Sequence, residues 1–519
     1  MSAFDGDSPR QLVPRWRPWR TTARLGESAS STRRRHEATV FDNERALSRF
    51  RDRPNVGRAA ELLTTALVHD YRNEEIQAIA GDYLSDRRPL LRELAAVTRM
   101  DPDERVHQAA RVEHRDPRKR IAQLKVLLTR EPSNALRWSD LAREYTVLAQ
   151  SAKATSAIRV ALLLAPENRF VLRSAATLYV QIDEKDRAVR LLETAPNLTV
   201  DPWVLAPYVA ISDLADHKSH HHRDAVRLLQ DEDIGQRDLA ELAAALGTAE
   251  VNAGSGRRGR QLLRRSAEDP TENSLAQVEW MSGRLRSRLV DTTLSDVLRD
   301  FEARARRAAY DGRWDVAVTS SSHWLDDQPF SADAACFGSF CAWMAEDWAK
   351  SNRIANDGLR SNPGHPVLLN NAAVALVEAG ELAKAGEILS HSRGVRAQSR
   401  ERAFLAATEG MFFFRIGMVE AGRHRYNRII TFFEDNHEDE IAARAALILA
   451  REEILANTPE AHSSLRRAKA RMSASPPADL VTLRDRIASL CPQAGIRPVV
   501  IPKGIELSLD ALLKLPATL

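Results

Sequence analysis

Residues 135–168 read ALRWSDLAREYTVLAQSAKATSAIRVALLLAPEN, and they carry the clearest structural signal in the chain. Two amphipathic runs of helical length flank a short polar turn, and Pro166 marks the end of the second run. Small residues such as Ala142 and Ala161 alternate with large ones such as Trp138 and Ile158. This pattern predicts a hairpin of two helices, in which the small residues permit close approach and the large residues fill the gaps.

The same theme recurs along most of the chain at a nearly constant period. Pro132 and Pro166 are 34 residues apart, and Pro329 and Pro363 are again 34 residues apart. Few segments alternate apolar and polar residues as a half-buried strand would. A constant period of this length indicates stacked repeats, each of which buries its apolar face on its neighbours. The sequence therefore predicts an all-α fold.

These repeats resemble the tetratricopeptide repeat (TPR) family. Trp138, Leu141, Ala142 and Tyr145 match the family pattern W-x2-L-G-x2-Y, with Ala in place of Gly. Clear further units are 169–202, 366–399 and 403–436, and weaker ones are 73–100, 101–134, 203–236, 239–272, 298–331, 332–365 and 438–474. The resemblance implies a right-handed α-solenoid of roughly ten TPR-like helix pairs.

The repeat phase and the composition predict six segments. They are a disordered Arg/Trp-rich tail (1–40), N-terminal repeats (41–271), an extra helix that breaks the phase (272–297), C-terminal repeats (298–474), a capping helix (475–491) and an apolar extension (492–519). The extension is expected either to fold back on the last repeats or to dock on a partner, as a strand or as a helix in a groove.

Composition narrows the class of protein. The chain has 519 residues, 44% hydrophobic residues and only three cysteines, too few for a disulfide scaffold. No stretch approaches the ~18 apolar residues of a membrane helix, and no secretory signal is recognisable. We therefore expect a cytoplasmic protein that does not bind membranes. The formal net charge is +4, and residues 1–35 hold eight arginines against three acidic residues, so a basic tail precedes a nearly neutral body.

Motifs that might support catalysis are weak. Gly254–Gly259 satisfies G-x-G-x-x-G, but no strand precedes it, so a basic turn between helices is favoured over a dinucleotide site. The histidines of 217–222 lack a completing metal ligand, and the acidic turn 434–440 lacks the spacing of a calcium loop. Cys336 and Cys341 are five residues apart and point to different helix faces. With no nucleophile–base set, the sequence predicts no enzyme, no metal and no cofactor.

The tail motif Arg15-Trp16-Arg17-Pro18-Trp19-Arg20 interleaves guanidinium groups with indoles. This chemistry suits phosphate contact and base stacking, which makes nucleic acid or another polyanion one candidate ligand. The favoured interpretation is that the tail docks onto the helical body or onto another protein. The third interpretation is that the tail has no specific role.

The TPR resemblance also implies a concave ligand surface lined by the first helix of each pair. The positions that map to this surface in the C-terminal repeats are apolar and predict a partner-binding groove: Cys336, Phe340, Trp343, Met344, Val374, Val377, Met411 and Phe414. The matching earlier positions are polar or basic: Arg143, Arg173, Thr177 and Arg306. With the tail, the three arginines are candidate polyanion contacts. The alternative for the apolar set is that it belongs to the core or is covered by the C-terminal extension.

These features favour a non-enzymatic scaffold or adaptor that binds a segment of another protein in the groove. It could act alone or as the recognition subunit of a larger assembly. The second-ranked function is that of a nucleic-acid-associated regulator, which would use the basic tail and the arginine-lined part of the groove.

Overall fold

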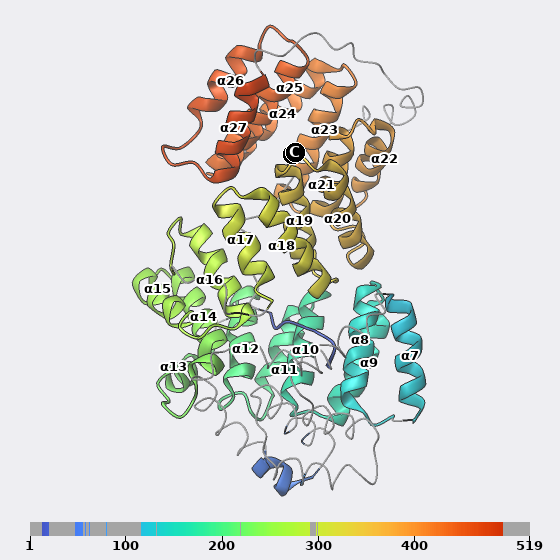
Figure 1. Ribbon diagram of the computed structural model, residues 1–519, viewed down its shortest axis with the longest axis vertical. Coiled ribbons are helices and arrows are strands. Elements are labelled where there is room, and N and C mark those ends of the chain that lie inside the picture. Colours follow the sequence, from blue (N-terminus) through green and yellow to red (C-terminus); the bar gives the residue numbers. More distant parts are fainter. Residues whose placement is uncertain are drawn as a thin grey trace. The chain divides into compact units, whose positions relative to one another are not determined.

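The computed structural model describes residues 13–19, 47–54, 58, 62, 79, 116–130, 132–217, 219–290, 297 and 299–490. These residues form α-helices joined by short turns and contain no β-strand (Figure 1). They belong to two compact units, Asp7–Ala303 (the N-terminal unit) and Arg304–Leu519 with Met1–Gly6 (the C-terminal unit). No described helix is both long enough and apolar enough to cross a membrane.

In the N-terminal unit, first and second helices of successive pairs alternate along the chain. After α7 (Pro117–Arg130), the first helices are α8 (Ala135–Val147), α10 (Arg169–Gln181), α12 (Pro202–Leu214), α14 (Gln236–Asn252) and α16 (Glu272–Arg284). The second helices are α9 (Ser151–Leu164), α11 (Lys185–Glu193), α13 (His222–Leu229) and α15 (Gly256–Arg265). Each first helix from α8 to α14 contacts the next first helix, so the series forms one continuous inner face.

The C-terminal unit follows the same plan. Its first helices are α17 (Phe301–Tyr310, which starts in the preceding unit), α19 (Ala332–Met344), α21 (Pro366–Glu378), α23 (Ser399–Arg415) and α25 (Asp439–Leu455). The second helices are α18 (Trp314–Asp327), α20 (Trp348–Ser361), α22 (Leu382–Ser392), α24 (Val419–Asp435) and α26 (Ala461–Ala470), and α27 (Ala478–Leu490) packs on α25. The all-α repeat fold expected from the sequence is confirmed.

Capping side chains set where several first helices begin. Asn134 and Asn168 accept hydrogen bonds from the backbone N–H groups of the first turns of α8 and α10. Asp201 does the same for α12, and Thr271 forms a reciprocal capping box with Ser274 at α16. Because the first N–H groups of a helix lack partners within it, these caps fix the helix starts, and thereby the register of the inner face.

The small residues of the repeat are buried between its helices. Ala142, Ala154 and Ala161 are fully buried, and so are the larger Ile158 and most of Tyr145. Trp138 is the exception in this unit. Its indole is partly exposed and donates a hydrogen bond to the carbonyl of Pro132 at 2.8 Å, so it closes the turn and does not fill the core as the sequence suggested.

The G-x-G-x-x-G motif joins α14 to α15, and its glycines have packing roles. Gly254 has φ +87°, a conformation that favours glycine, in the turn between the helices. A Cβ atom on Gly259 would lie 2.5 Å from Cγ2 of Val251 and 2.7 Å from the carbonyl oxygen of Gly247. The motif is therefore a site of close helix packing preceded by a helix, α14, and this arrangement excludes the strand–turn–helix of a dinucleotide site.

Two segments predicted from the repeat phase coincide with described helices. α16 lies inside 272–297, and α27 lies inside 475–491. Most of the tail, residues 80–115 of the N-terminal repeats and the whole of 492–519 lie outside the described residues. The two expectations for the C-terminal extension therefore stay predictions.

We expect Gly259→Ala to lower the free energy of unfolding by about 1–3 kcal/mol, because the added methyl group overpacks the α14–α15 contact. Gly283→Ala is the matched control, since a methyl group added there in α16 would meet no atom within 4 Å. In the control, alanine should be neutral or stabilising by up to about 1 kcal/mol. Urea denaturation followed by circular dichroism measures both, and equal effects would contradict the packing role.

Candidate functional site

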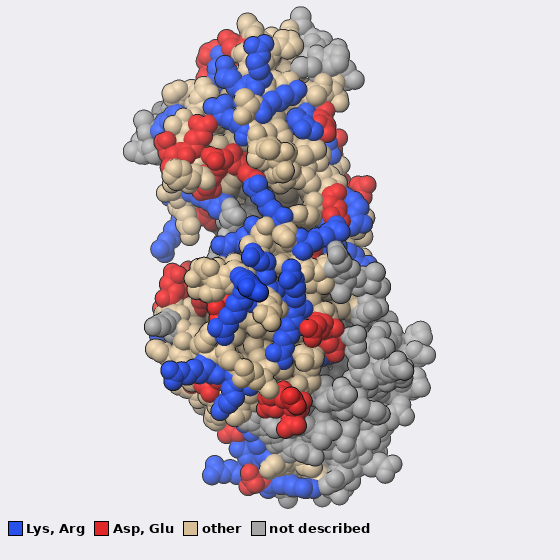
Figure 2. Space-filling model, turned by 90° about the vertical axis from the view of Figure 1, so that its left-hand side faces the viewer, with Lys and Arg blue, Asp and Glu red and all other residues tan. Residues whose placement is uncertain are grey.

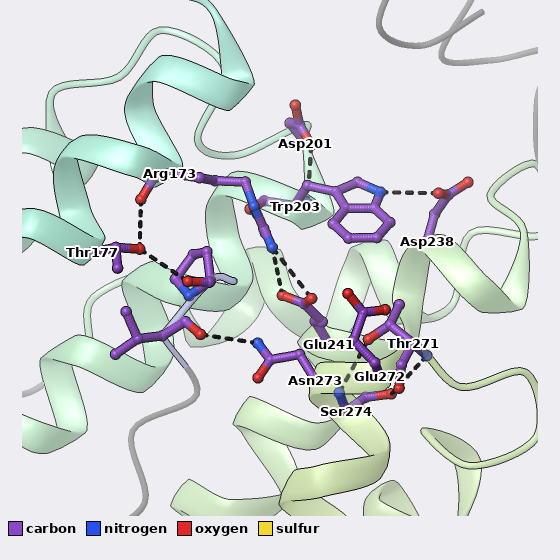
Figure 3. A network of polar contacts seen from close by, with 12 residues as sticks. Arg173, Thr177, Asp201, Trp203, Asp238, Glu241, Thr271, Glu272, Asn273 and Ser274 are labelled. Atoms are coloured by element: carbon purple, nitrogen blue, oxygen red, sulfur yellow. Dashed lines mark hydrogen bonds and ion pairs between the residues drawn. The ribbon is translucent and has the colours of Figure 1, made fainter. Parts of the chain in front are cut away.

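Residues 13–19 have no regular structure before Trp19 and lie against the inner face of the N-terminal unit. They contact side chains of α8, α10 and α16 and Glu302 at the start of α17, and these side chains define the candidate site: Asp140, Arg143, Phe170, Thr177, Glu272, Asn273 and Glu302. Figure 3 shows part of this contact, with Thr177 and Asn273 reaching the segment from opposite sides. Residues 15–19 of the tail motif are thus docked on the helical body of their own chain.

Side chains of the inner face hold the main chain of the segment. Asn273 donates through Nδ2 to the carbonyl of Val13 at 3.1 Å, and the Thr177 hydroxyl donates to the carbonyl of Pro14 at 3.0 Å. Arg143 donates through Nε to the carbonyl of Trp16 at 2.8 Å. These three donors are nearly fully buried, and buried donors of this kind need partners. The carbonyl groups of the segment are partners for all three donors, and the Thr177 hydroxyl also lies 2.9 Å from the Arg173 carbonyl of its own helix.

Two carboxylates receive the arginines of the segment. Arg15 forms an ion pair with Glu302, and Nη1 of Arg17 lies 2.5 Å from Oε1 of Glu272. Burial raises the pKa of Glu272, but the neighbouring Arg17 guanidinium and its hydrogen bond outweigh burial, so the pKa lies below its ordinary value. Glu272 therefore stays ionised opposite Arg17 at neutral pH.

The two indoles of the segment fill apolar space. Trp16 and Trp19 are 1% and 2% exposed, which ranks them among the most buried large side chains of the chain. Trp19 packs edge-on against Phe170, with ring centroids 5.2 Å apart. Burial of two aromatic side chains is worth several kcal/mol, so the indoles anchor the segment while the polar contacts orient it.

A second network lies beside the segment and neutralises Arg173 (Figure 3). Its guanidinium stacks on Trp203 at 5.0 Å and lies 2.9 Å from Oε2 of Glu241. The Trp203 indole N–H donates to Asp238 at 2.9 Å. Arg143 is likewise 2.9 Å from Glu144. Both arginines lie on the inner face, but their charges are compensated within the unit.

Asp140 contacts the last described residue of the segment. It accepts a hydrogen bond from the backbone N–H of Trp19 at 2.9 Å. Loss of solvation raises the pKa of Asp140 to about 6, although the Trp19 N–H and the nearby Arg120 oppose this shift. The carboxylate therefore takes up a proton at a mildly acidic pH in the docked state.

The apolar positions predicted in the C-terminal unit are not an open surface. All eight are at most 7% exposed: Cys336, Phe340, Trp343, Met344, Val374, Val377, Met411 and Phe414. The expectation of an exposed apolar groove at 332–415 is therefore wrong, and the alternative that these side chains are core or covered describes them better. Their role as partner anchors stays a prediction that the structure does not support.

Charged side chains and α27 explain this burial. Arg444 lies over the Phe340 ring at 5.8 Å and pairs with Asp479 of α27, and the Trp314 indole donates to Thr482 of the same helix. Farther along the unit, Glu378 accepts from the Trp343 indole at 3.1 Å. Arg451, 11% exposed, lies 2.7 Å from that carboxylate and 3.8 Å from the sulfur of Met411.

The remaining predicted contacts are distributed over the two units. Arg306 belongs to the C-terminal unit, where its guanidinium lies 5.4 Å from the rings of both Trp324 and Phe337. Arg20 lies outside the described residues. The structure therefore brings together Arg15, Trp16, Arg17, Trp19, Arg143 and Thr177, with Arg173 beside them, and leaves Arg306 in a different unit.

The motifs set aside in the sequence have structural partners. His217, His221 and His222 pair with three different carboxylates, those of Asp186, Asp224 and Glu250. Within the described ranges, no group of three or more His, Cys, Asp or Glu residues is arranged to hold a metal ion. Cys336 and Cys341 are buried free thiols, and burial raises the pKa of Cys341.

Several residues of the site were missed in the sequence. Asp140, Glu272, Asn273 and Glu302 occupy helix positions that read as ordinary polar residues. The signal available was the cationic tail itself, because two arginines that dock inside a protein require acidic partners. Nothing in the repeat pattern indicates which of the chain's many carboxylates would serve.

Comparisons with known proteins concern the architecture alone. No protein-family model matches the chain, and no curated protein matches it. Among solved structures, the human IFIT1 dimer with PPP-AAAA matches at 13% identity and a TM-score of 0.34, covering 90% of this chain and 98% of that one. The human IFIT1 dimer with m7Gppp-AAAA matches at 14% identity and a TM-score of 0.32, covering 87% and 99%. At such TM-scores, function has to be argued from this chain's own residues.

We expect Asp140→Asn to stabilise the protein at pH 7.5 by on the order of 1 kcal/mol and to have a smaller effect at pH 5. The carboxyl has a higher pKa in the folded chain than in the unfolded chain, so its contribution to stability falls as the pH rises from about 4 to about 6. Asparagine keeps an oxygen for the Trp19 N–H and has no charge to desolvate. Thermal unfolding of both proteins at the two pH values measures the difference, and an equal shift at both would contradict the assignment.

Proposed function

We propose that the chain is a non-enzymatic protein-binding scaffold, and that a partner segment binds the inner face of its N-terminal unit. One observation carries the proposal, namely that residues 13–19 lie on this face as a peptide ligand would. The same geometry would serve a scaffold that acts alone and the recognition subunit of a larger assembly.

The contacts have the character of peptide recognition. Asn273, Thr177 and Arg143 donate hydrogen bonds to main-chain carbonyl groups, which every peptide has. Asp140 accepts a hydrogen bond from the backbone N–H of Trp19. Such contacts hold an extended chain in register, whereas side-chain pockets select its sequence. The donors project from packed helices, so the binding surface is rigid and the cost of ordering falls mainly on the ligand.

A display library of random 12-residue peptides tests this function. The bait is the full chain with Trp16→Ala/Trp19→Ala, which weakens the docked segment. We expect enriched peptides whose binding falls at least about tenfold when Asn273→Ala/Thr177→Val is added, because two hydrogen bonds to the peptide main chain are lost.

The matched control is Asn356→Ala/Thr319→Val, which makes the same substitutions at exposed positions of α20 and α18. It should leave binding unchanged. A library that yields no enriched peptide, or only peptides that bind the inner-face variant equally well, would contradict the proposed function.

A second candidate function, nucleic-acid binding, is favoured by the surface of α15. The helix reads GRRGRQLLRR and contains no acidic residue. Arg257, Arg260 and Arg264 are exposed, and no described residue forms an ion pair with them. Figure 2 shows lysines and arginines gathered on the side of the molecule where α15 lies. An unpaired cluster of this kind suits phosphate groups better than the tail arginines do, because Arg15 and Arg17 are already paired.

Titration with a single-stranded oligonucleotide at several salt concentrations tests this candidate. Arg257→Gln/Arg260→Gln/Arg264→Gln should weaken binding and reduce the slope of log affinity against log salt by about 2. The control, Arg187→Gln/Arg313→Gln/Arg360→Gln, removes the same charge from arginines that pair with nearby carboxylates. Identical slopes for the two variants would exclude α15 as the contact.

A further inference from the structure

The contacts of residues 13–19 indicate which kind of ligand the inner face of the N-terminal unit can bind. Pro14 and Pro18 have no backbone N–H, and proline favours an extended chain, so the main chain of the segment has fewer donors than acceptors. The inner face matches this with the three donors Asn273, Thr177 and Arg143. A ligand of this face is therefore extended, and proline suits these two positions because it has no backbone N–H that needs an acceptor.

The charges of the face select basic side chains. Glu272 and Glu302 are the carboxylates that meet the segment's arginines, and Glu302 is 3% exposed. A buried carboxylate that loses its cation is strongly destabilising, so an acidic or neutral residue opposite Glu302 would be rejected. Opposite Glu272, whose side chain is 21% exposed, such a residue would lose an ion pair. The two arginines are separated by one residue, Trp16, so a ligand needs cations at positions i and i+2.

The fit of the segment is imperfect at its C-terminal end. The indole Nε1 of Trp19 is buried and has no hydrogen-bond partner among the described residues. A buried N–H without a partner lowers the affinity of the occupant. Since the segment is part of the same chain, its high effective concentration compensates for this loss, and a free ligand must be better matched to displace it.

We infer that residues 13–19 act as an intramolecular competitor, and that the partner of the inner face is an extended basic-aromatic segment of another protein, with arginines at i and i+2 around an aromatic residue. This inference rests on the proposed function and adds the chemistry of the partner and its competition with the tail. The partner binds only as the chain's own segment leaves, so Trp16 and Trp19 become exposed when it binds.

The test uses a fluorescent peptide of residues 11–21 and full-length proteins. Fluorescence anisotropy should show at least about tenfold tighter binding to the Trp16→Ala/Trp19→Ala chain than to the wild type, because the competing segment is weakened in cis. The same peptide with Arg15→Glu/Arg17→Glu should bind at least about tenfold more weakly. Glu272→Gln, added to the Trp16→Ala/Trp19→Ala chain, should reduce the difference in affinity between the arginine peptide and the glutamate peptide.

A second variant that weakens docking of residues 13–19 is needed in case the Trp16→Ala/Trp19→Ala chain misfolds. Arg15→Glu/Arg17→Glu in the full chain leaves both indoles in place and should also open the inner face to the peptide. Circular dichroism and thermal unfolding establish that each variant is folded. Equal binding of the peptide to the wild type and to both folded variants would overturn the competition, and equal binding of the two peptides would overturn the charge rule.

The outcome also separates this inference from the proposed function. If the display library yields peptides that depend on Asn273 and Thr177 but lack arginine, the scaffold function stands and the basic-aromatic ligand class is wrong. If neither the library nor the 11–21 peptide shows binding that depends on these two residues, both proposals are wrong.

Discussion

Close approach of paired helices is the constraint on which the rest of the structure depends. It requires residues with almost no side chain where the helices meet, as at Gly259, and it is accompanied by the full burial of Ala142 and Ala161. In the C-terminal unit, a Cβ atom on Gly422 would lie 2.5 Å from Cδ2 of Phe414. Because these contacts leave no room for adjustment, the helix positions are set, and with them the side chains that each first helix turns to the inner face.

The inner faces of the two units carry charged groups that burial would make costly without partners. The N-terminal unit satisfies part of this requirement with a segment distant in sequence, through Arg15 with Glu302 and Arg17 with Glu272. The C-terminal unit satisfies it with its own helices, and Arg451 shows this by pairing with both Glu378 and Glu452. Equivalent faces of one repeat fold thus have different occupants, which explains why their chemistry differs.

The repeat pattern of the sequence predicted the positions of the helices better than it predicted which side chains are exposed. An alanine at a helix crossing is recognisable from spacing, because its neighbours three and four residues away share the same buried face. The helical spacing of Phe340, Trp343 and Met411 predicted that they lie on an inner face. It did not indicate which residues cover that face. Here Arg444 and Arg451 cover it, together with α27, and they come from parts of the chain about 40 to 140 residues away.

The sequence by itself determined that this chain is a stack of helical hairpins, because periodicity and small residues are local properties that hold in any such stack. It also showed a tail whose arginines and indoles require partners. Only the tertiary structure decided which partners they have, since Trp19 meets Asp140 across 121 residues and Arg15 meets Glu302 across 287. Contacts at such separation depend on how the repeats stack in three dimensions, and a one-dimensional pattern contains no record of that stacking.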